Sequence, residues 1–344
     1  ARPRLSGAEC GVRSLSGHVA PLARAHASWL LTSQPRGAAM TSRRSFLSAA
    51  ALSAAAAALH PLPALAAAPV AAPGLAKRVI PATGESIPVI GMGTSGSFEV
   101  DAAGRGPLQE VLRRFVAGGA SVIDTSPNYG NAEDVLGDLM TELGVRDRIW
   151  LATKLAADDR AAGEAQFAQS LKRLRTDKVE LLAVHNLRDW KTQLAYAREL
   201  KARGKTKYVG LTHYVDGKHD ELADIMTAEK PDFIQINYSV STTNADKRLL
   251  PLARDTGVAV MINRAFDDGR LFARVAGKAL PGWAAEAGVT SWAQMFLKFV
   301  ISHPAVTVVI PATGKPDRQS DNLKAGHGRD LSAAERAELV AMFA

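Results

Sequence analysis

The sequence predicts an α/β fold, a (β/α)8 barrel, and three observations lead to that class. Short apolar runs alternate with amphipathic stretches from about Val79 to the end of the chain. Eight of the runs have the length of β-strands, and all but the last are clearly followed by a helical stretch. Polar residues stand at the carboxyl ends of the runs, where barrel enzymes carry their chemistry. An open doubly wound sheet is the main alternative, because a strand count from one sequence errs by about one or two.

The expected elements follow one another as strand and helix along the chain. The strands, in order, are Val89–Gly93, Ser121–Asp124, Ile149–Thr153, Glu180–His185, Tyr208–Leu211, Phe233–Ile236, Val258–Ile262 and Thr307–Ile310. Between them, residues spaced three and four apart make helical faces. Three such faces are Leu108, Val111, Leu112, Phe115 and Val116; Leu194, Ala197, Leu200 and Lys201, ended by Gly204; and Trp292, Met295, Phe296, Phe299 and Val300.

A glycine-rich segment at the first strand, Gly91 to Gly96, matches the G-x-G-x-x-G fingerprint of dinucleotide-binding folds. That fingerprint requires a helix at its last glycine and an acidic residue ending a second strand about twenty residues on. Here the next helix is expected only from about Pro107, and no such acid is found. Glycines of tight turns are the better interpretation.

Composition limits the partners of the protein. The chain has 344 residues and a formal net charge of +8, most of it from arginines in residues 1–44, so the body gives no sign of a nucleic-acid surface. Its one cysteine, Cys10, cannot form an internal disulfide or a thiolate metal cluster. No metal ligand set and no stable membrane span are expected in the mature chain.

The first part of the chain predicts an exported protein. Residues 1–39 are expected to be a disordered extension upstream of the true start at Met40. Residues 40–66 resemble a twin-arginine signal peptide, with Arg43 and Arg44 before Phe46-Leu47, an alanine-rich apolar stretch and a cleavage site at Ala64–Ala66. A membrane anchor or a surface helix is the alternative. Residues 67–78 then form a linker, 79–344 form the barrel domain, and the mature protein is expected in the periplasm.

Seven polar residues stand at or near the carboxyl ends of six expected strands. These residues are Asp124, Lys154, His185, Thr212 with His213, Gln235 and Asn263, and in a parallel barrel they all face one mouth. Tyr129 lies on a loop shortly after Asp124. A phenol gives up its proton poorly at neutral pH unless a cation such as Lys154 stabilises the phenolate.

A charge network follows from this placement. A buried lysine needs a carboxylate, which Asp124 supplies, and His185 can hold a carbonyl oxygen by a hydrogen bond. Taken singly, Asp124 could cap a helix, Lys154 could be a solvated loop residue, and His185 could be a core histidine. The four together favour carbonyl reduction.

These motifs resemble the aldo/keto reductase family from about Val79 to Ala325. The segment Asp124–Gly130 matches the family's Asp-x-(Ala/Ser)-x-x-Tyr-Gly block, and Ala152-Thr153-Lys154 and Ala183-Val184-His185 match its other two catalytic positions. The resemblance implies that Tyr129 is the general acid, that Lys154 and Asp124 tune it, and that His185 orients the substrate.

The resemblance also implies a nicotinamide cofactor. Gly204 to His213 and Gln235-Ile236-Asn237-Tyr238 are similar to segments that contact the nicotinamide carboxamide, and Ile310 to Asn322 is similar to the adenosine-phosphate loop. The implied cofactor-binding residues are Thr212, His213, Gln235, Asn263, Thr313, Lys315, Arg318 and Asn322. Lys315 and Arg318 are the cations nearest a 2′-phosphate, so NADP(H) is expected over NAD(H).

Several positions depart from the family pattern. His213 replaces an asparagine, Asn263-Arg264-Ala265-Phe266 lacks the tyrosine that stacks on nicotinamide, and Ala312 replaces a lysine. Ser95 and Asn186 stand where aromatic residues usually wall the substrate pocket. Because the tail after Asn322 is short, the pocket is expected to be open and less apolar than usual.

The function expected from the sequence is reduction of a small aldehyde or ketone by a nicotinamide-dependent enzyme that the twin-arginine machinery exports. One alternative is a non-catalytic nicotinamide-binding barrel that acts as an accessory or sensor protein. Another is a barrel hydrolase or isomerase, but such enzymes need paired carboxylates or metal ligands at the rim.

Overall fold

The structure is a computed structural model, and it describes residues 74–344. The predicted extension at 1–39, the signal peptide at 40–66 and most of the 67–78 linker lie outside these residues. Strand β1 (Lys77–Val79) begins within the predicted linker. No helix in the described part of the chain combines the length and the hydropathy needed to cross a membrane.

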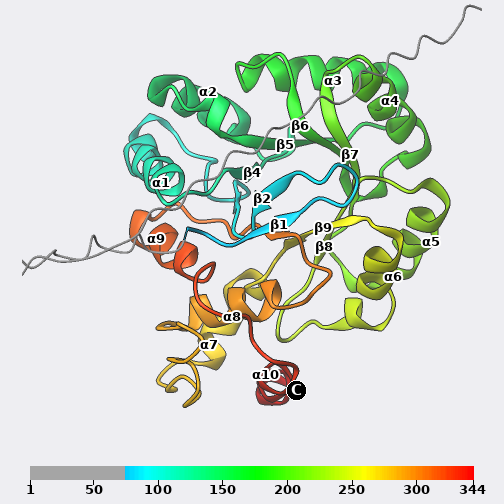
Figure 1. Ribbon diagram of the computed structural model, residues 1–344. Helices are drawn as coiled ribbons and strands as arrows, with labels where there is room; N and C mark the ends of the chain where they lie inside the picture. The colour runs from blue at the N-terminus through cyan, green and yellow to red at the C-terminus, as the bar shows by residue number, and fades with distance from the viewer. Residues whose placement is uncertain (1–73) are drawn as a thin grey trace, which may run out of the picture. The chain divides into compact units, whose positions relative to one another are not determined.

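Eight parallel strands form the centre of the molecule (Figure 1). They are β3 (Met92–Gly93), β4 (Val122–Asp124), β5 (Trp150–Leu155), β6 (Val179–Val184), β7 (Thr206–Thr212), β8 (Phe233–Asn237), β9 (Ala259–Asn263) and β10 (Val308–Val309). They pair in sequence order from β3 to β10. Parallel bridges from Ile90 to Val309 and from Gly93 to Ala312 join the first strand to the last, so the sheet closes into a barrel. The predicted fold class is confirmed, and the open sheet is excluded.

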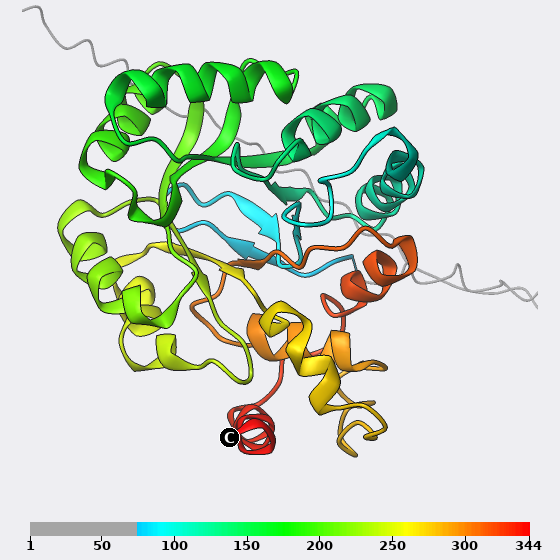
Figure 2. The ribbon, with the colours of Figure 1, turned by 180° about the vertical axis from the view of Figure 1, so that it is seen from behind.

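Helices surround the barrel, as the view from behind also shows (Figure 2). They are α1 (Arg105–Ala117), α2 (Ala132–Leu143), α3 (Arg160–Arg173), α4 (Trp190–Ala202), α5 (His219–Glu229), α6 (Leu249–Thr256), α7 (Arg270–Arg274), α8 (Trp292–Ile301), α9 (Pro316–Lys324) and α10 (Ala333–Phe343). The predicted apolar faces of α1, α4 and α8 are buried, with Trp292 half-buried. Lys201 is the exception, because its side chain extends to the carboxylate of Asp232 at 2.6 Å.

The first two glycines of the G-x-G-x-x-G segment serve barrel closure rather than a turn. A Cβ atom on Gly91 would lie 2.8 Å from the carbonyl oxygen of Val122, and one on Gly93 would lie 3.0 Å from that of Ile310. The neighbouring strands therefore approach too closely for a side chain. Only Gly96, at φ +66°, has the backbone of a turn glycine.

The barrel interior is filled by alternate residues of each strand, which explains where the polar strand ends point. On β5, Trp150 and Ala152 belong to the interior cluster, and Lys154 comes next at the same period of two. Trp150, Tyr208 and Phe233 pack with ring centroids 5.5–5.8 Å apart. Alternate residues of each strand therefore point into the barrel, and the last residue of this inward-facing row is the one that the strand contributes to the site.

An antiparallel hairpin of β1 and β2 (Ser86–Pro88), absent from the sequence prediction, contributes to this interior. Ile80 and Ile87 belong to the same buried cluster as Trp150. The phenol of Tyr208 donates to Glu85 at 2.6 Å and so ties the hairpin to β7. Since Trp150 and Tyr208 lie toward the amino ends of their strands, the hairpin covers that end of the barrel and leaves the other end for the site.

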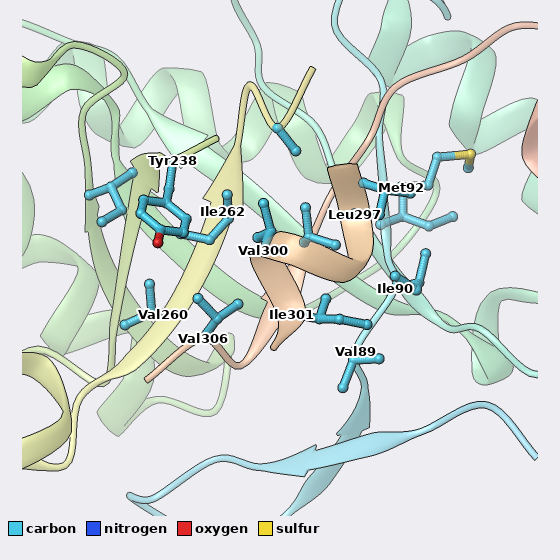
Figure 3. Packing of buried hydrophobic residues seen from close by; sticks show 14 of the residues in the cluster. Val89, Ile90, Met92, Tyr238, Val260, Ile262, Leu297, Val300, Ile301 and Val306 are labelled. Carbon is cyan, nitrogen blue, oxygen red and sulfur yellow. The ribbon is translucent and has the colours of Figure 1, made fainter. Parts of the chain in front are cut away.

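A second, larger apolar layer lies between the strands and the helices (Figure 3). Leu297, Val300 and Ile301 of α8 share this layer with Ile262 of β9 and with Ile90. Each of these five side chains is at most 2% exposed. Burial of this kind stabilises a domain by about 25 cal/mol per Å² of apolar surface, so the scaffold that carries the strand ends is rigid.

Candidate active site

A lysine and an aspartate form a buried ion pair at the carboxyl ends of β4 and β5. Lys154 is 1% exposed, and its Nζ donates to both carboxylate oxygens of Asp124 at 2.7 and 2.6 Å and to the carbonyl of Thr125 at 2.8 Å. Burial lowers the pKa of Lys154, but the charge of Asp124 raises it, and the net pKa lies above its usual value. Lys154 is therefore a charged, buried ammonium and not a solvated loop residue. Asp124 is its ion-pair partner and does not cap a helix.

Tyr129 lies above this pair on the loop after β4. The ammonium of Lys154 is 5.2 Å from the centre of its ring. Burial raises the pKa of the Tyr129 phenol, and the charge of Lys154 offsets part of that rise. The phenol therefore carries its proton at neutral pH, and a phenolate formed there would be stabilised by the ammonium.

His185, directly after β6, packs its ring edge against Tyr129, with centroids 5.8 Å apart and planes at 86°. Burial and the charge of Lys154 lower the pKa of His185 to about 3, so the imidazole is neutral at physiological pH. Its Nδ1 is 3.1 Å from the hydroxyl of Ser126. His185 lines a cavity, so it is not merely a core histidine.

Ser126 is a site residue that the sequence analysis missed. Its side chain is fully buried, and its hydroxyl oxygen accepts the backbone N–H of Asn128 at 3.3 Å. Because that oxygen already accepts a hydrogen bond, the hydroxyl hydrogen is available for Nδ1 of His185. This arrangement favours the tautomer with its proton on Nε2, a nitrogen for which the structure shows no hydrogen bond to a described residue.

Gln235 and Thr212 support the ion pair instead of standing free for a ligand. The amide of Gln235 donates to Oδ1 of Asp124 at 2.9 Å, and its carbonyl accepts from the hydroxyl of Thr212 at 3.2 Å. Both residues also line the cavity. The contacts that the structure shows for their side chains hold Asp124 in place.

The cavity at this mouth has a volume of about 1300 Å³ and extends from the strand ends to helices α8 and α9. Six of the eight predicted cofactor-binding residues line it: Thr212, Gln235, Asn263, Thr313, Arg318 and Asn322. His213 and Lys315 are not among its lining residues. Nδ1 of His213 accepts the backbone N–H of Tyr214 at 3.1 Å, while Lys315 occupies the N-cap position of α9.

The residues present fit a nicotinamide dinucleotide. Oδ1 of Asn263 is buried at the cavity without a hydrogen-bond partner, and the exposed Arg318 pairs with no carboxylate among the described residues. The first turn of α9 lies beside Thr313, and a helix N-terminus favours an anion such as a phosphate. These donors and the free acceptor lie on the half of the mouth formed by β7–β10.

Aromatic side chains also line this same half of the cavity. The cavity is lined there by Tyr214, Phe266, Phe272 and Trp292, of which Tyr214 is 45% and Phe272 is 40% exposed. Phe266 and Phe272 pack with centroids 5.1 Å apart. Phe272 belongs to the segment between β9 and α8, which the barrel pattern does not require, so periodicity could not locate it.

A closed parallel barrel with a tyrosine above a buried lysine–aspartate pair at its mouth points to a class of barrel oxidoreductases. Within that class, the chain belongs to the aldo/keto reductase family, whose sequence model matches residues 89–342.

Known proteins are similar to the chain at moderate identity. Aldo-keto reductase YhdN of Bacillus subtilis is 30% identical over 173 residues, which is 44% of this chain and 50% of that protein. The NADH-specific methylglyoxal reductase of Escherichia coli is 26% identical over 198 residues, or 48% of this chain and 58% of the relative. The chain thus spans about half the length of these curated relatives.

Solved structures extend the similarity over more of the fold. An aldo/keto reductase from Klebsiella pneumoniae, determined in complex with NADP and acetate, is 26% identical with a TM-score of 0.64. The match covers 76% of this chain and 93% of that one. An aldo-keto reductase from Bacillus halodurans in its holo form, 20% identical with a TM-score of 0.65, shares the fold.

Proposed function

We propose that the protein reduces the carbonyl group of small aldehydes or ketones, with Tyr129 as the proton donor. The observation that carries this proposal is the position of the Tyr129 ring 5.2 Å from the ammonium of Lys154, itself held by Asp124. A nicotinamide cofactor bound in the cavity would supply the hydride. The residues of the chain then have to place the carbonyl and deliver one proton to its oxygen.

Tyr129 and His185 have different roles in this reaction. Tyr129 holds its proton before the reaction and gives it to the carbonyl oxygen as negative charge develops there. The ammonium of Lys154 stabilises the phenolate that remains. Neutral His185, with its proton on Nε2, donates a hydrogen bond to the same oxygen and orients the carbonyl.

We infer that NADP(H) is preferred over NAD(H). Arg318 is exposed at the cavity and has no carboxylate partner in the described part of the chain, and a guanidinium fits the fork of a 2′-phosphate. The relatives differ, because the Klebsiella structure holds NADP while the Escherichia coli reductase is NADH-specific.

The proposed reaction is tested by Tyr129→Phe, which removes the phenolic proton and keeps the ring. Turnover of an aldehyde with NADPH should fall about 10²–10⁴-fold, while quenching of protein fluorescence by NADPH should show nearly unchanged affinity. Tyr196→Phe, at a buried tyrosine on α4, is the matched control and should keep wild-type turnover. Wild-type kcat in Tyr129→Phe would contradict the mechanism.

We propose, separately, that the twin-arginine route exports the protein to the periplasm. This rests on the order of Arg43-Arg44, the apolar stretch and the Ala64–Ala66 site, and on the lack of cysteine after Cys10. A folded barrel could carry its cofactor through that route. Fractionation should find the wild type in the periplasm and Arg43→Lys/Arg44→Lys in the cytoplasm; equal export of both would overturn the proposal.

A further inference from the structure

Glu133 carries a buried carboxyl group that the proposed reaction does not use. It lies in the first turn of α2 and is 1% exposed. Its Oε1 accepts the hydroxyl of Thr153 at 2.7 Å, and its Oε2 accepts the hydroxyl of Ser170 at 3.0 Å. The guanidinium of Arg173 is farther away, at 3.9 Å from Oε2. Hydroxyl groups of two different elements, β5 and α3, therefore hold the two oxygens.

Burial of this carboxyl group is costly. Burial raises the pKa of Glu133, and the hydrogen bonds from Thr153 and Ser170 offset part of that rise. Replacing a buried ionic group by an apolar side chain of similar volume is often neutral or stabilising, so stability alone does not account for a carboxyl group here. A hydrogen bond fixes distance and direction, whereas the hydrophobic effect has no direction. What the carboxyl group adds is a defined position of α2.

The bond from Thr153 joins the two segments that carry Tyr129 and Lys154. Thr153 directly precedes Lys154 on β5, and neighbouring side chains of a strand point to opposite faces, so one faces α2 while the other faces the mouth. The backbone N–H of Ala132 donates to the carbonyl of Tyr129 at 2.8 Å, which ties the start of α2 to the Tyr129 loop. Within residues 74–344, the structure shows no other hydrogen bond between a side chain of α2 and a strand.

We propose that Glu133 is a positioning residue that, through Thr153, sets the distance between the ring of Tyr129 and the ammonium of Lys154. This inference rests on the proposed reductase function and deepens it by adding a residue that does not line the cavity. The bond from Ser170 instead joins α2 to α3, an element with no residue in the cavity lining. Because a displacement of about 1 Å can lower turnover about a hundredfold, loss of the Thr153 bond should be visible in kcat.

The first test compares the two hydroxyl groups that bind the same carboxyl group. Thr153→Val removes the donor on β5 and keeps a β-branched side chain, and Ser170→Ala removes the donor on α3. With saturating NADPH and aldehyde, kcat should fall about threefold to tenfold in Thr153→Val and stay within about twofold of wild type in Ser170→Ala. NADPH affinity, measured by fluorescence quenching, should be unchanged in both, since the candidate cofactor contacts lie on the β7–β10 half.

Substitutions of Glu133 itself separate position from stability. Glu133→Leu removes both acceptors and should lower kcat about tenfold to a hundredfold, whereas Glu133→Gln keeps an acceptor for Thr153 and should stay within about threefold of wild type. Leu139→Ala is the matched control, because Leu139 is buried about two turns further along α2. It should lower the free energy of unfolding through the cavity that it leaves and still keep the wild-type kcat.

A second measurement reports the position of Tyr129 without turnover. The ring of His185 packs against Tyr129 with centroids 5.8 Å apart, so the NMR shifts of its ring protons depend on where the phenol lies. These shifts should change in Glu133→Leu and Thr153→Val and should stay as in the wild type in Leu139→Ala.

Equal kcat in Thr153→Val and Ser170→Ala, a loss in Glu133→Gln as large as in Glu133→Leu, or unchanged His185 shifts in Glu133→Leu would overturn the assignment and leave the reductase function intact. If the wild type reduces no carbonyl compound, the proposed function fails, and the His185 shifts still decide whether Glu133 positions Tyr129.

Discussion

The two halves of the barrel mouth are organised in different ways. On the β3–β6 side, the charges of Asp124 and Lys154 are buried and find their partners within the protein. On the β7–β10 side, Arg318 is exposed and Oδ1 of Asn263 has no partner. The charged groups of the first half are paired within the protein before any ligand binds. The second half presents an arginine and an amide oxygen whose partners a ligand would have to supply.

For the proposed function, this difference separates the groups that would catalyse the reaction from those that would bind the cofactor. A preorganised buried network acts on a developing charge without having to reorganise, which is the main source of electrostatic catalysis. Unpaired groups at a cavity gain most when a ligand pairs them. Changes on the β3–β6 side should therefore affect turnover and stability, and changes on the β7–β10 side should affect cofactor affinity.

The largest effect is expected for Lys154→Met. It leaves the carboxylate of Asp124 buried without its ammonium, which should lower the free energy of unfolding by about 3–5 kcal/mol and abolish most turnover. Adding Asp124→Leu should restore much of the stability but none of the activity. Chemical denaturation and steady-state kinetics measure the two quantities separately.

Lys298→Met is the matched control for that substitution. Lys298 of α8 is also 1% exposed, but its Nζ donates to the backbone carbonyl of His327, so its removal leaves no carboxylate without a partner. It should cost less stability and keep turnover. Equal losses in the two methionine variants would show that burial of any lysine, rather than the ion pair, accounts for the effect.

The next effect concerns His185 and pH. The unfolded chain binds a proton on this histidine below about pH 6.5, but the folded protein does so only near pH 3. The folded state is therefore destabilised as pH falls through that window, by about 1.4 kcal/mol per unit, and the contribution is complete only above pH 6.5. His185→Gln should show a shallower loss of unfolding free energy from pH 6.5 to 4 than the wild type; parallel curves would argue against a neutral His185.

The sequence predicts the β3–β6 half well because its residues follow from the period of a strand. Asp124, Lys154 and His185 continue interior rows at a spacing of two, and eight strand segments could be located from their apolar pattern. The closing strands β3 and β10 are shorter than predicted, since closure depends on how closely the backbone approaches at Gly91 and Gly93.

The β7–β10 half was predicted less well because its side chains are directed by loops. His213 accepts a hydrogen bond from its own loop backbone, and Lys315 stands at the N-cap position of α9 outside the cavity lining, although both stand in matching motifs. The aromatic lining contributed by Phe272 comes from an insertion without a periodic signal. Ser126 was missed for a related reason, as its contact with His185 joins two loops far apart in sequence.

A smaller effect on the binding half is expected for Arg318→Ala. A hydrogen bond to a charged group contributes about 1.5–3 kcal/mol, so affinity for NADPH should fall about tenfold to a hundredfold. Affinity for NADH should change little, because it lacks the 2′-phosphate. Fluorescence titration with both cofactors measures this, and Arg113→Ala on the outer side of α1 is the control. Equal weakening for both cofactors would remove Arg318 from phosphate recognition.

The smallest effect should come from Ser126→Ala, which tests how finely the catalytic half is arranged. The substitution removes the hydroxyl at Nδ1 of His185 but leaves Tyr129, Lys154 and Asp124 in place. A neutral imidazole without that partner can place its proton on either nitrogen, so only part of the population donates from Nε2. One neutral hydrogen bond contributes about 1 kcal/mol, which predicts a loss of about fivefold in kcat/KM.

Ser170→Ala separates this tautomer effect from the loss of any buried hydroxyl. Ser170 is also fully buried and donates to Glu133 at 3.0 Å, away from His185. It should reduce stability comparably and keep kcat/KM, while NMR of the His185 ring nitrogens should show a mixed tautomer only in Ser126→Ala. If the His185 ring keeps its proton on Nε2 in Ser126→Ala, the packing of Tyr129 against His185, rather than the hydroxyl of Ser126, fixes the tautomer of His185.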